Sequence, residues 1–406
     1  MKGIYIHRQI EKTLNSFVRQ FPAVVLTGPR QSGKSTLLSN LFGKTHSIIS
    51  FDDPLARERA LSDPHLFLES AGDKVIFDEI QYVPQILPFI KMLIDKDRER
   101  RGRFIITGSC QFNLIKELAE TLAGRVGILE LLPFDRGETE NIPDLKPKLT
   151  TTHHHFIHAC LVGCFPELCI YPMINPVSWY GSYIATYLER DIRSIYNIGS
   201  LREFQRFLQL LASRCSQILN LSSLANELGV AVNTIKRWIS VLEASRIIYL
   251  LTPYYQNLGK RITKSPKVYF LDCGLVCYLT GLKDTEHLLK GPLSGALFEN
   301  YCVQETIKSF FNQGLSPKIF YLRTHNELEI DLLIERDNLL YPFEFKMTKT
   351  LNLGMTAPIE RLKRVFSKLN IAKGRIISLS EDNISLSKDV SAQSMSEYLR
   401  WLQGSS

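Results

Sequence analysis

Several features of membrane and secreted proteins are missing from this sequence. No apolar run approaches the roughly 20 residues that a membrane-spanning helix needs, and the first residues contain neither a long apolar core nor a small-residue cleavage site. The 8 cysteines of the 406-residue chain are scattered in apolar contexts rather than placed at framework spacing, which suits a reducing compartment. We therefore expect a cytoplasmic protein without a membrane span or a disulfide scaffold.

The composition is that of an ordinary globular protein. Hydrophobic residues make up 45% of the chain and charged residues 22%, so each domain can bury a core. Because 406 residues exceed the size at which one core usually stops growing, we expect two or three domains. The formal net charge of +8 is compatible with a polyanionic partner such as DNA, but it does not decide the question without a clustered patch.

The N-terminal part of the chain alternates short apolar runs with longer amphipathic stretches. The short runs predict buried strands and the stretches between them predict helices. This alternation favours a parallel sheet covered by helices on both faces, and so an α/β fold for a first domain over residues 1–135. The expected strands are Ala23–Thr27, Ser47–Phe51, Lys74–Phe77 and Arg103–Thr107.

The rest of the chain divides into two further parts. Residues 135–152 are polar and contain two prolines, so we expect a linker there. Residues 153–275 predict a helical region, with a winged helix at about 218–272. Residues 290–385 predict a second α/β domain in the order helix, three strands, helix, strand. The tail after Glu381 is polar and rich in serine.

Residues 28–35 have the pattern of a phosphate-binding loop. They fit G-x-x-x-x-G-K-[ST] at each fixed position, after an apolar strand and before a helix. The glycines let backbone N–H groups turn toward phosphate oxygens, and the helix N-terminus adds its dipole. We expect Lys34 to contact the outer phosphates as a catalytic residue and Ser35 to bind Mg²⁺. The predicted ATP site comprises Gly28, Pro29, Arg30, Gln31, Ser32, Gly33, Lys34, Ser35 and Thr36.

Two carboxylates follow a later apolar strand. Val75–Phe77 runs directly into Asp78 and Glu79. At this distance after a phosphate-binding loop, we expect Asp78 to hold Mg²⁺ through water and Glu79 to polarise the attacking water. A solvated turn is the common alternative for such a pair of acidic residues, and the preceding loop decides against it here.

The next strand ends in polar residues. Phe104–Ile106 leads into Thr107 and Ser109, which would sit between the first two motifs and sense the γ-phosphate. A plain strand-to-turn exit is an equal alternative for them. Arg125 is a further catalytic candidate that would neutralise transition-state charge on the phosphates of its own chain or of a neighbouring subunit. A solvent-facing arginine is nearly as good an interpretation.

Together these residues resemble a known family. The matching segments are Pro29–Gln31, Phe77–Gln81, Thr107–Ser109, Leu122–Arg125, Pro133–Phe134 and Thr186–Asp191. The chain resembles, from Tyr5 to about Leu379, the bacterial and archaeal AAA-type ATPases that carry a C-terminal domain of unknown function similar to PD-(D/E)XK nucleases. The resemblance implies the fold and the ATP chemistry. This sequence departs from the family at Gly163–Glu167, where family members more often have two glycines.

Residues 221–238 have helix-turn-helix character. A short amphipathic helix ends at Gly229 and a second helix begins near Asn233, with Val232, Ile235, Ile239 and Leu242 on one face. The other face, where a recognition helix would meet DNA, carries Asn233, Lys236, Arg237 and Ser240. Basic residues on the expected wing would contact phosphates, namely Lys260, Arg261, Lys264 and Lys267. A packing or partner-binding role for this winged helix is an equal alternative.

Four residues near the C-terminus fit the order that the resemblance leads one to seek. Glu299 lies on a predicted helix, Asp331 on a strand, and Glu344 and Lys346 on the next strand, where alternate residues share a face. Asp331 and Glu344 would bind one or two Mg²⁺ or Mn²⁺ ions, Lys346 would orient water, and Glu299 would assist. The set favours a nuclease-like fold more than it favours cleavage, because folds persist when activities are lost.

A group of histidines and cysteines suggests zinc at first sight. His153, His154, His155 and His158 precede Cys160, Cys164 and Cys169. The spacing does not match the paired patterns of structural zinc sites, and an apolar helix with buried cysteines is the better interpretation.

Three hypotheses about function follow. The first is an ATPase that couples its nucleotide state to DNA or to a protein partner. The second is a metal-dependent DNA nuclease with a regulatory ATPase, and the third is a nucleotide-controlled DNA-binding regulator. Each allows the chain to act as an oligomer.

Overall fold

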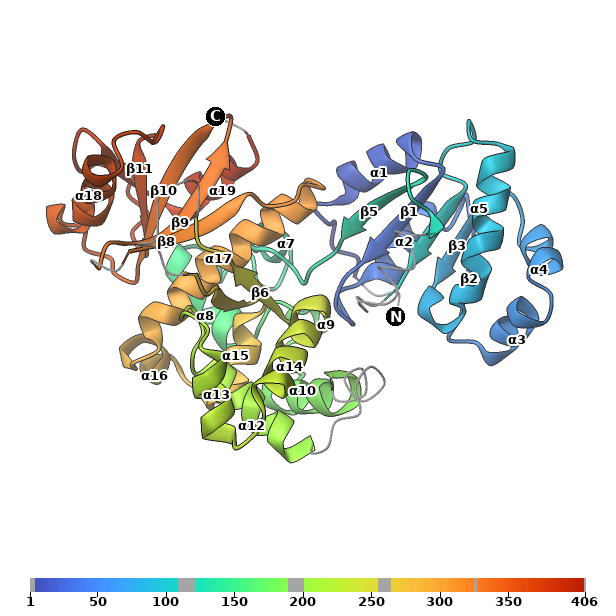
Figure 1. Cartoon of the computed structure of the whole chain (residues 1–406), viewed down its shortest axis with the longest axis horizontal. Coiled ribbons are helices and arrows are strands. Elements are labelled where there is room, and N and C mark those ends of the chain that lie inside the picture. Colours follow the sequence, from blue (N-terminus) through green and yellow to red (C-terminus); the bar gives the residue numbers. More distant parts are fainter. Residues whose placement is uncertain (1–3, 109–120, 189–200, 255–263, 325–326, 405–406) are drawn as a thin grey trace.

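The computed structural model describes residues 4–108, 121–188, 201–254, 264–324 and 327–404. Figure 1 shows an N-terminal α/β domain on the right, a helical region below the centre and a C-terminal α/β domain at the upper left. In the described part of the chain, no helix is both long and apolar enough to cross a membrane.

The N-terminal domain is a five-stranded parallel sheet in the order β2-β3-β4-β1-β5. The predicted strands are confirmed within a residue or two, and the predicted α/β fold is correct. The strands are β1 (Ala23–Thr27), β2 (Ser47–Ser50), β3 (Val75–Asp78), β4 (Phe104–Thr107) and β5 (Val126–Glu130). β1 lies between β4 and β5, so the phosphate-binding loop follows an inner strand of the sheet rather than an edge strand.

Helices cover both faces of this sheet because its strands alternate apolar side chains between the faces. Val24 and Leu26 pack with α1 and α2, whereas Ala23 and Val25 pack with the helices of the opposite face. The helical elements are α1 (Glu11–Gln20), α2 (Lys34–Phe42), α3 (Pro54–Ser62), α4 (Pro64–Ser70), η1 (Ile80–Tyr82), η2 (Pro84–Ile86) and α5 (Leu87–Lys96).

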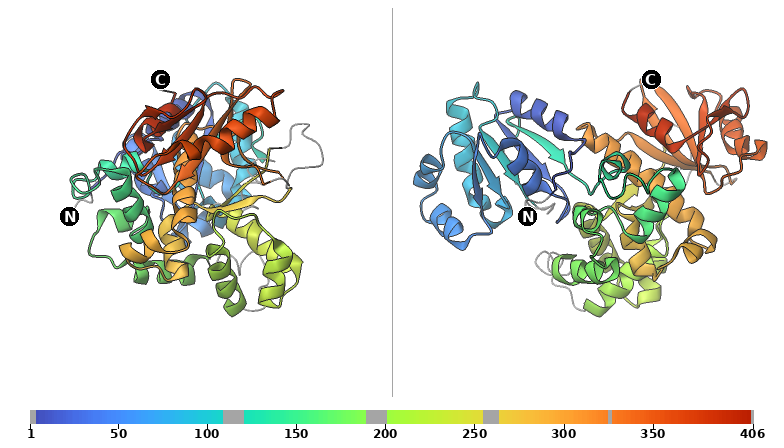
Figure 2. Two further views of the ribbon diagram at one scale, coloured as in Figure 1. Left: turned by 90° about the vertical axis from the view of Figure 1, so that its left-hand side faces the viewer. Right: turned by 180° about the vertical axis from the view of Figure 1, so that it is seen from behind.

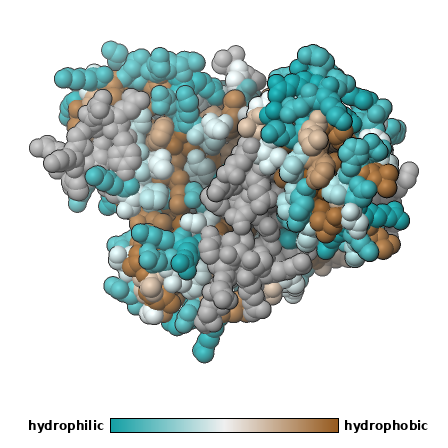
Figure 3. All heavy atoms as spheres, turned by 45° about the vertical axis from the view of Figure 1, so that its right-hand side comes forward, coloured by the Kyte–Doolittle hydropathy of each residue, from teal (hydrophilic) through white to brown (hydrophobic). Residues whose placement is uncertain are grey.

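The outer helices of this domain expose several large apolar side chains. Leu55 and Leu61 of α3, Leu66 of α4 and Met92 of α5 are 49–61% exposed. Figure 3 shows brown apolar patches on the face of the N-terminal domain that it presents, at the right. Apolar side chains gathered on one surface are a common feature of protein contact sites.

The predicted linker is wrong in part. α7 (Arg136–Glu140) begins with a capping box in which Asp135 and Glu138 accept each other's backbone N–H groups. Asp135, Arg136 and Glu138 are all buried. The polar residues of this segment therefore form an internal hydrogen-bonded turn rather than a solvated connection.

The helix-turn-helix of the middle region lies where the sequence predicts it. α13 (Leu221–Leu228) ends at Gly229, whose φ of 70° suits glycine, and α14 (Val232–Ala244) follows. Two antiparallel strands come next, β6 (Ile248–Leu251) and β7 (Lys267–Phe270). The remaining elements are α8 (Thr152–Leu161), α9 (Pro166–Ile170), α10 (Pro176–Tyr183), η3 (Ile184–Leu188), α12 (Leu201–Ala212), α15 (Cys273–Thr280) and α16 (Thr285–Lys290).

The C-terminal domain has the predicted order of helix, three strands, helix and strand. Its sheet has the order β12-β13-β11-β10-β9-β8. The prediction of a polar tail after Glu381 is wrong, because two strands and α19 (Met395–Leu402) in this segment complete the domain. Met395, Tyr398 and Leu402 of α19 are buried. The other elements are α17 (Ser294–Asn312), β8 (Ile319–Arg323), β9 (Glu329–Arg336), β10 (Leu339–Lys346), η4 (Leu353–Thr356), α18 (Ala357–Val365), β11 (Gly374–Ser378), β12 (Ile384–Ser385) and β13 (Val390–Gln393).

Helix α17 connects the three parts of the molecule. Figures 1 and 2 show it between the C-terminal sheet and the helical region, with one end toward the N-terminal domain. At that end, the Thr13 hydroxyl of α1 donates a 2.7 Å hydrogen bond to the carbonyl of Asn312. Nearly every residue of its last three turns is buried. Helix α17 therefore packs against all three parts of the molecule.

Candidate functional site

The phosphate-binding loop depends on glycine at both fixed positions. Gly28 has a φ of 147°, and a Cβ placed there would lie 2.1 Å from the carbonyl oxygen of Leu131. Gly33 has a φ of 94° and caps the N-terminus of α2. A side chain at either position would strain the backbone or displace the segment that follows β5. The loop therefore keeps its curvature only with these glycines.

Lys34 and Ser35, the first residues of α2, face the centre of the loop. Lys34 is 5% exposed, and its Nζ donates to the carbonyls of Gly28 and Pro29 at 3.1 and 2.9 Å. The Ser35 hydroxyl lies 3.0 and 2.9 Å from the two carboxylate oxygens of Asp78. The structure thus brings together the two residues predicted to bind Mg²⁺ although they are 43 positions apart.

Thr107 completes this cluster. β4 lies between β3 and β1, so Thr107 at its end is next to Asp78. Its hydroxyl donates to the carboxylate of Asp78 and accepts a 3.1 Å hydrogen bond from the backbone N–H of Glu79. Thr107 is therefore in contact with the second motif, while the neighbouring candidate Ser109 lies outside the described residues.

Glu79 has an uncommon backbone conformation. Its φ of 60° and ψ of 46° place it in the left-handed region, where non-glycine residues are rare and often functional. Its carboxylate accepts a hydrogen bond from the side chain of Gln81. The left-handed turn ends β3 at Asp78, and the backbone of Glu79 is tied to Thr107, which also binds Asp78.

A cavity of about 510 Å³ opens beside the loop. Loop residues Gln31 and Gly33 and the first turn of α2, including Thr36, line one side of it. The segment before α1 and helix α9 supply the other walls. Its lining combines apolar and aromatic side chains with a few polar ones, and the residues other than those of the loop and α2 are Ile4, Tyr5, Ile6, Arg8, Phe134, Pro166, Glu167, Ile170 and Tyr171.

Arg8 is a site residue that the sequence did not single out. Its guanidinium donates to the carbonyl of Ser32 in the loop at 2.8 Å and to the carbonyl of Leu132 at 2.7 Å. Its Nε lies 2.9 Å from a carboxylate oxygen of Glu138 in α7. Arg8 is 6% exposed, so this buried cation holds the loop against the segment that leaves the sheet.

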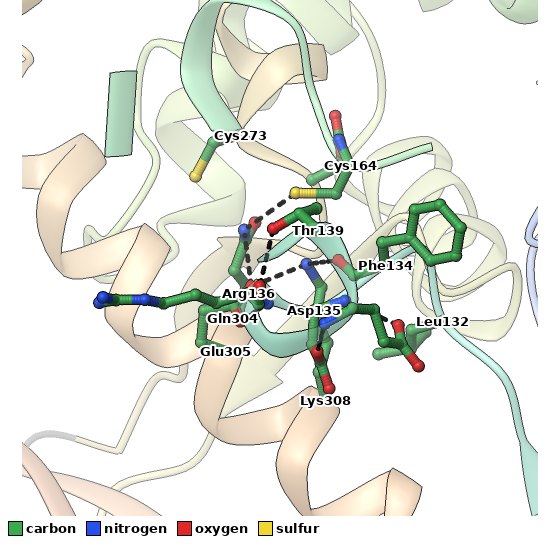
Figure 4. A network of polar contacts seen from close by, with 12 residues as sticks. Leu132, Phe134, Asp135, Arg136, Thr139, Cys164, Cys273, Gln304, Glu305 and Lys308 are labelled. Atoms are coloured by element: carbon green, nitrogen blue, oxygen red, sulfur yellow. Dashed lines mark hydrogen bonds and ion pairs between the residues drawn. The ribbon is translucent and has the colours of Figure 1, made fainter. Parts of the chain in front are cut away.

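The segment held by Arg8 also contacts α17. The Lys308 Nζ donates to the Phe134 carbonyl at 2.8 Å, and the N–H of Arg136 donates to Glu305 at 2.7 Å. Figure 4 shows these α17 side chains converging on the turn of residues 134–136. Buried polar contacts therefore run from the loop through Arg8 to α17.

The structure contradicts one of the two roles predicted for Arg125. Its carbonyl accepts from the N–H of Ala23, so it lies at the amino end of β1, opposite the edge that carries the loop. Its guanidinium binds both carboxylate oxygens of Asp95 at 2.7 and 3.0 Å. A strand of five residues spans about 16 Å, so Arg125 does not contact the phosphate site of its own chain.

Three of the four C-terminal candidates lie together. The Lys346 Nζ is 2.6 Å from Glu344 and 3.6 Å from Asp331, and Asp331 accepts from the N–H of Phe345. Glu299 instead pairs with Lys267 at 3.0 Å. Among the described residues, no three histidine, cysteine or acidic side chains are arranged as a metal-binding group. The predicted second metal site is therefore not formed in this conformation.

Burial shifts the protonation of these carboxyl groups. Burial, with the nearby charge of Asp331, raises the pKa of Glu344 to about 8. Burial also raises the pKa of Glu299 to about 7, against the opposing effect of Lys267. For Lys267, burial would lower the pKa, but Glu299, Asp331 and Glu329 outweigh it and raise the pKa instead. Lys267 thus carries its charge inside the protein.

The recognition-helix candidates have the predicted orientation. Asn233, Lys236 and Arg237 are exposed on α14, while its apolar face packs in the core. The prediction for Lys267 is wrong, because it is 2% exposed and bound to carboxylates rather than presented on a wing. Lys260 and Arg261 lie outside the described residues.

The histidine and cysteine group is divided among separate contacts. His155 is buried with its Nε2 3.0 Å from Glu140. Cys160, Cys164 and Cys169 are buried, and burial raises the pKa of each thiol above its usual range. These cysteines act as small apolar residues of the core.

Three family models match successive parts of the chain. Residues 20–140 match an AAA domain, residues 153–286 match a domain of unknown function, DUF8612, and residues 294–398 match another, DUF4143. The limits agree with the three parts of the structure. The AAA match covers the phosphate-binding loop, Asp78, Glu79 and Thr107, and so assigns the N-terminal domain as a P-loop ATPase domain.

Similar proteins are found among solved structures and among curated sequences. The Walker-type ATPase PABY2304 of Pyrococcus abyssi is similar at 15% identity and a TM-score of 0.41, over 68% of this chain and 96% of that one. The structure of a RuvB variant of Thermotoga maritima is similar at 17% identity and a TM-score of 0.31, over 61% and 90%. The uncharacterized proteins Rv2008c of Mycobacterium tuberculosis and Mb2031c of Mycobacterium bovis are each 30% identical over 388 residues, which is 95% of this chain and 82% of theirs. The chain therefore belongs to the family of Rv2008c and Mb2031c, with an AAA-type P-loop ATPase domain at its N-terminus.

Proposed function

We propose that the protein is a Mg²⁺-dependent ATPase. The observation that carries the proposal is the contact of Ser35 with both carboxylate oxygens of Asp78 at the mouth of the loop. A hydroxyl and a carboxylate are oxygen ligands of the kind that Mg²⁺ prefers, so these residues fit the ion. Held by Ser35 and Asp78, the ion would supply positive charge next to the negatively charged phosphate groups of ATP.

The other residues of the site have roles in binding and in positioning water. Lys34 exchanges its two carbonyl acceptors for phosphate oxygens, and the N–H groups of the loop bind the remaining phosphate oxygens. Glu79, beside this cluster, orients and deprotonates the attacking water. Thr107 holds Asp78 and the backbone of Glu79 in register through its single hydroxyl.

The cavity beside the loop is the place for the nucleotide base. Its volume of about 510 Å³ falls within the usual range for ligand pockets, about 300–1,000 Å³. Tyr5 and Tyr171 offer rings against which a base can stack. Because Tyr171 follows α9 of the middle region, a base bound in this cavity would contact both the ATPase domain and the middle region.

Exchanging Glu79 for glutamine is expected to separate ATP binding from hydrolysis. The amide keeps the shape of the side chain but cannot take the proton of water, so turnover should fall by about 10²–10⁴-fold. ATP and Mg²⁺ should still bind, because Lys34, Ser35 and Asp78 are unchanged. Phosphate release and retained radiolabelled ATP measure the two quantities on the same sample.

Glu69→Gln is the matched control, since Glu69 lies on the surface of α4. It should leave turnover at the wild-type value. If Glu79→Gln hydrolyses ATP at the wild-type rate, Glu79 is not the base and the proposed role fails. If wild-type protein neither binds nor hydrolyses ATP with Mg²⁺, the proposed function itself fails.

We further propose that the ATPase couples its nucleotide state to DNA through the helix-turn-helix. Arg8 contacts the loop, and the segment it holds contacts α17, whose neighbours include β7 of the middle region. The exposed face of α14 carries Asn233, Lys236 and Arg237. A protein partner is the alternative occupant of this face. The exposed apolar side chains of α3, α4 and α5 offer a partner or another copy a second place to bind.

Removing both exposed basic side chains of α14 tests the DNA proposal. Lys236→Ala with Arg237→Ala should weaken binding to duplex DNA uniformly across sequences. It should also reduce the slope of log K against log salt by about 1 for each phosphate that the variant no longer neutralises. Fluorescence anisotropy between about 50 and 200 mM salt measures both effects. Lys12→Ala with Arg19→Ala, on exposed positions of α1, removes the same charge elsewhere, and an equally large reduction there would contradict a specific role for α14.

A metal-dependent nuclease is the second candidate function. The proximity of Asp331, Glu344 and Lys346 favours it. Cleavage that requires Mg²⁺ or Mn²⁺ and is lost on Asp331→Ala would support it. No cleavage of single-stranded, duplex and branched DNA, with and without ATP, would rule against it.

A further inference from the structure

A side chain two residues after Glu79 contacts the carboxylate of that residue. Gln81 lies in η1, and its Nε2 donates a hydrogen bond to Glu79 Oε2. An ionised carboxylate accepts hydrogen bonds but donates none, so the amide nitrogen of Gln81 faces Glu79 and the amide oxygen points elsewhere. The contact with Glu79 therefore fixes the orientation of the Gln81 amide.

The oxygen of the same amide lacks a hydrogen bond. Gln81 Oε1 is buried and has no partner in the part of the chain that the structure describes. Buried acceptors are rarely left in this state, and a catalytic role or a bound water is a common explanation for those that are. Because Oε1 and Nε2 belong to one planar amide, this acceptor lies next to the carboxylate of Glu79.

The backbone that carries both side chains is held firmly. The N–H of Glu79 donates to the Thr107 hydroxyl at 3.1 Å, and the N–H of Tyr82 donates to the Glu79 carbonyl at 3.2 Å. Ile80 and Val83, on either side of Gln81 and Tyr82, are buried. Side chains that act in catalysis need such support, because small misplacements are costly. The Glu79–Gln81 pair is thus preorganised.

The neighbouring polar side chains are already engaged. Both carboxylate oxygens of Asp78 contact the Ser35 hydroxyl, and the Thr107 hydroxyl donates to Asp78 while it accepts from the Glu79 backbone. A water molecule bound at Glu79 has two protons, and the base takes only one of them. Within this described cluster, Gln81 Oε1 is the acceptor that remains for the second proton.

We propose that Gln81 is a positioning residue of the ATPase site, which holds Glu79 and the attacking water in one arrangement. Its Nε2 fixes the carboxylate that takes one proton of the water, and its Oε1 accepts a hydrogen bond from the other proton. With both protons held, the water oxygen keeps its lone pairs for the phosphate. This inference rests on the proposed hydrolysis of ATP with Glu79 as the base, and it adds a second side chain that orients the water.

Turnover and ATP affinity of Gln81→Leu in the full chain with Mg²⁺ test this proposal. Leucine has a similar size but neither a donor nor an acceptor, so kcat should fall by about 10–100-fold. The Kd for ATP should stay near the wild-type value, because Lys34 and Ser35 are unchanged. Gln85→Leu is the matched control, since Gln85 is exposed on η2, and it should behave as wild type. Gln81→Ala should show the same fall in kcat, and it replaces Gln81→Leu if thermal unfolding shows that the leucine variant is not folded.

Two further variants separate positioning of Glu79 from a structural role. Residues that act as a unit have non-additive effects, so Gln81→Leu should cost little more turnover once Glu79→Gln has removed the base. Gln81→Glu keeps acceptor oxygens but sets a negative charge against Glu79 in place of the donor. Its kcat should fall at least as far as that of Gln81→Leu.

Several outcomes would overturn the proposal. These are wild-type turnover in Gln81→Leu or Gln81→Glu, a double variant whose losses multiply, and a Kd for ATP that rises as far as kcat falls. Each leaves the ATPase proposal intact if wild type hydrolyses ATP and Glu79→Gln does not. Wild-type protein that fails to hydrolyse ATP would instead refute the proposed function.

Discussion

Replacing Lys34 by alanine is expected to abolish ATP binding. The Lys34 Nζ is the cation at the centre of the loop, 5% exposed and directed at the Gly28 and Pro29 carbonyls. Charge-assisted hydrogen bonds to phosphate in such a water-poor position are strong. Their loss should raise the Kd for ATP by at least about 100-fold, which corresponds to about 2.7 kcal/mol. Isothermal titration calorimetry with ATP and Mg²⁺ measures it.

The control for this change is Lys44→Ala, an exposed lysine just after α2. It removes the same charge beside the same helix and should leave ATP binding unchanged. Thermal unfolding without nucleotide should give similar Tm values for Lys34→Ala and wild type, since water can satisfy the loop carbonyls of Gly28 and Pro29 when the lysine is removed. ATP binding or turnover that survives Lys34→Ala at the wild-type level would contradict the ATPase proposal.

The nucleotide site could be predicted because its parts are local or follow from a general rule. Gly28 to Ser35 are contiguous, and a strand, a loop and a helix in that order define their conformation. Asp78 and Thr107 are distant in sequence but end neighbouring parallel strands, whose carboxyl ends meet at one edge of the sheet. Sequence periodicity identifies those strands, so it also identifies which side chains meet.

Arg8 and Lys267 could not be predicted in the same way. Arg8 acts through the carbonyls of Ser32 and Leu132, and backbone acceptors leave no mark in a sequence. Lys267 follows three other basic residues and has the pattern of a DNA-binding wing. Its burial is decided by Glu299 and Glu329, which lie much further along the chain. Such long-range pairing depends on how domains pack, which local patterns do not encode.

Two structural errors had signals that were present in the sequence. Asp135 followed three residues later by Glu138 is the signature of a capping box, and it marks the start of α7. Met395, Tyr398 and Leu402 have helical spacing within the serine-rich end of the chain, and they are the buried residues of α19. In both segments the prediction followed the polar composition, although a short helical pattern in the same residues indicated the structure that is found.

Replacing Lys308 by methionine is expected to destabilise the whole protein. Lys308 is 1% exposed on α17, and its Nζ is 2.9 Å from Glu305 and 2.8 Å from the carbonyl of Phe134. Figure 4 shows it beneath the turn that joins the ATPase domain to the middle region. Methionine has a similar length but leaves the carboxylate of Glu305, also 1% exposed, without its cation.

The size of this effect follows from the burial of both partners. Removing one member of a buried ion pair costs about 3–5 kcal/mol. At about 2.1 cal/mol/K of unfolding entropy for each of the 406 residues, this corresponds to a fall in Tm of roughly 4–6 °C by calorimetry. Lys308→Met with Glu305→Gln should recover part of the loss, since no buried charge then lacks a partner. Lys318→Met, an exposed lysine shortly after α17, should leave Tm unchanged.

Lys308→Met should also weaken ATP binding. A measurement of ATP affinity therefore distinguishes a role of α17 in connecting the domains from a role in stability alone. The Phe134 carbonyl that Lys308 holds is close along the chain to the Leu132 carbonyl that Arg8 holds, and Arg8 also binds the loop at Ser32. If α17 transmits its position to the loop, the folded fraction of Lys308→Met should bind ATP more weakly at a temperature well below its Tm. A lower Tm with unchanged ATP affinity would limit Lys308 to stability, and an unchanged Tm would contradict the importance of the buried pair itself.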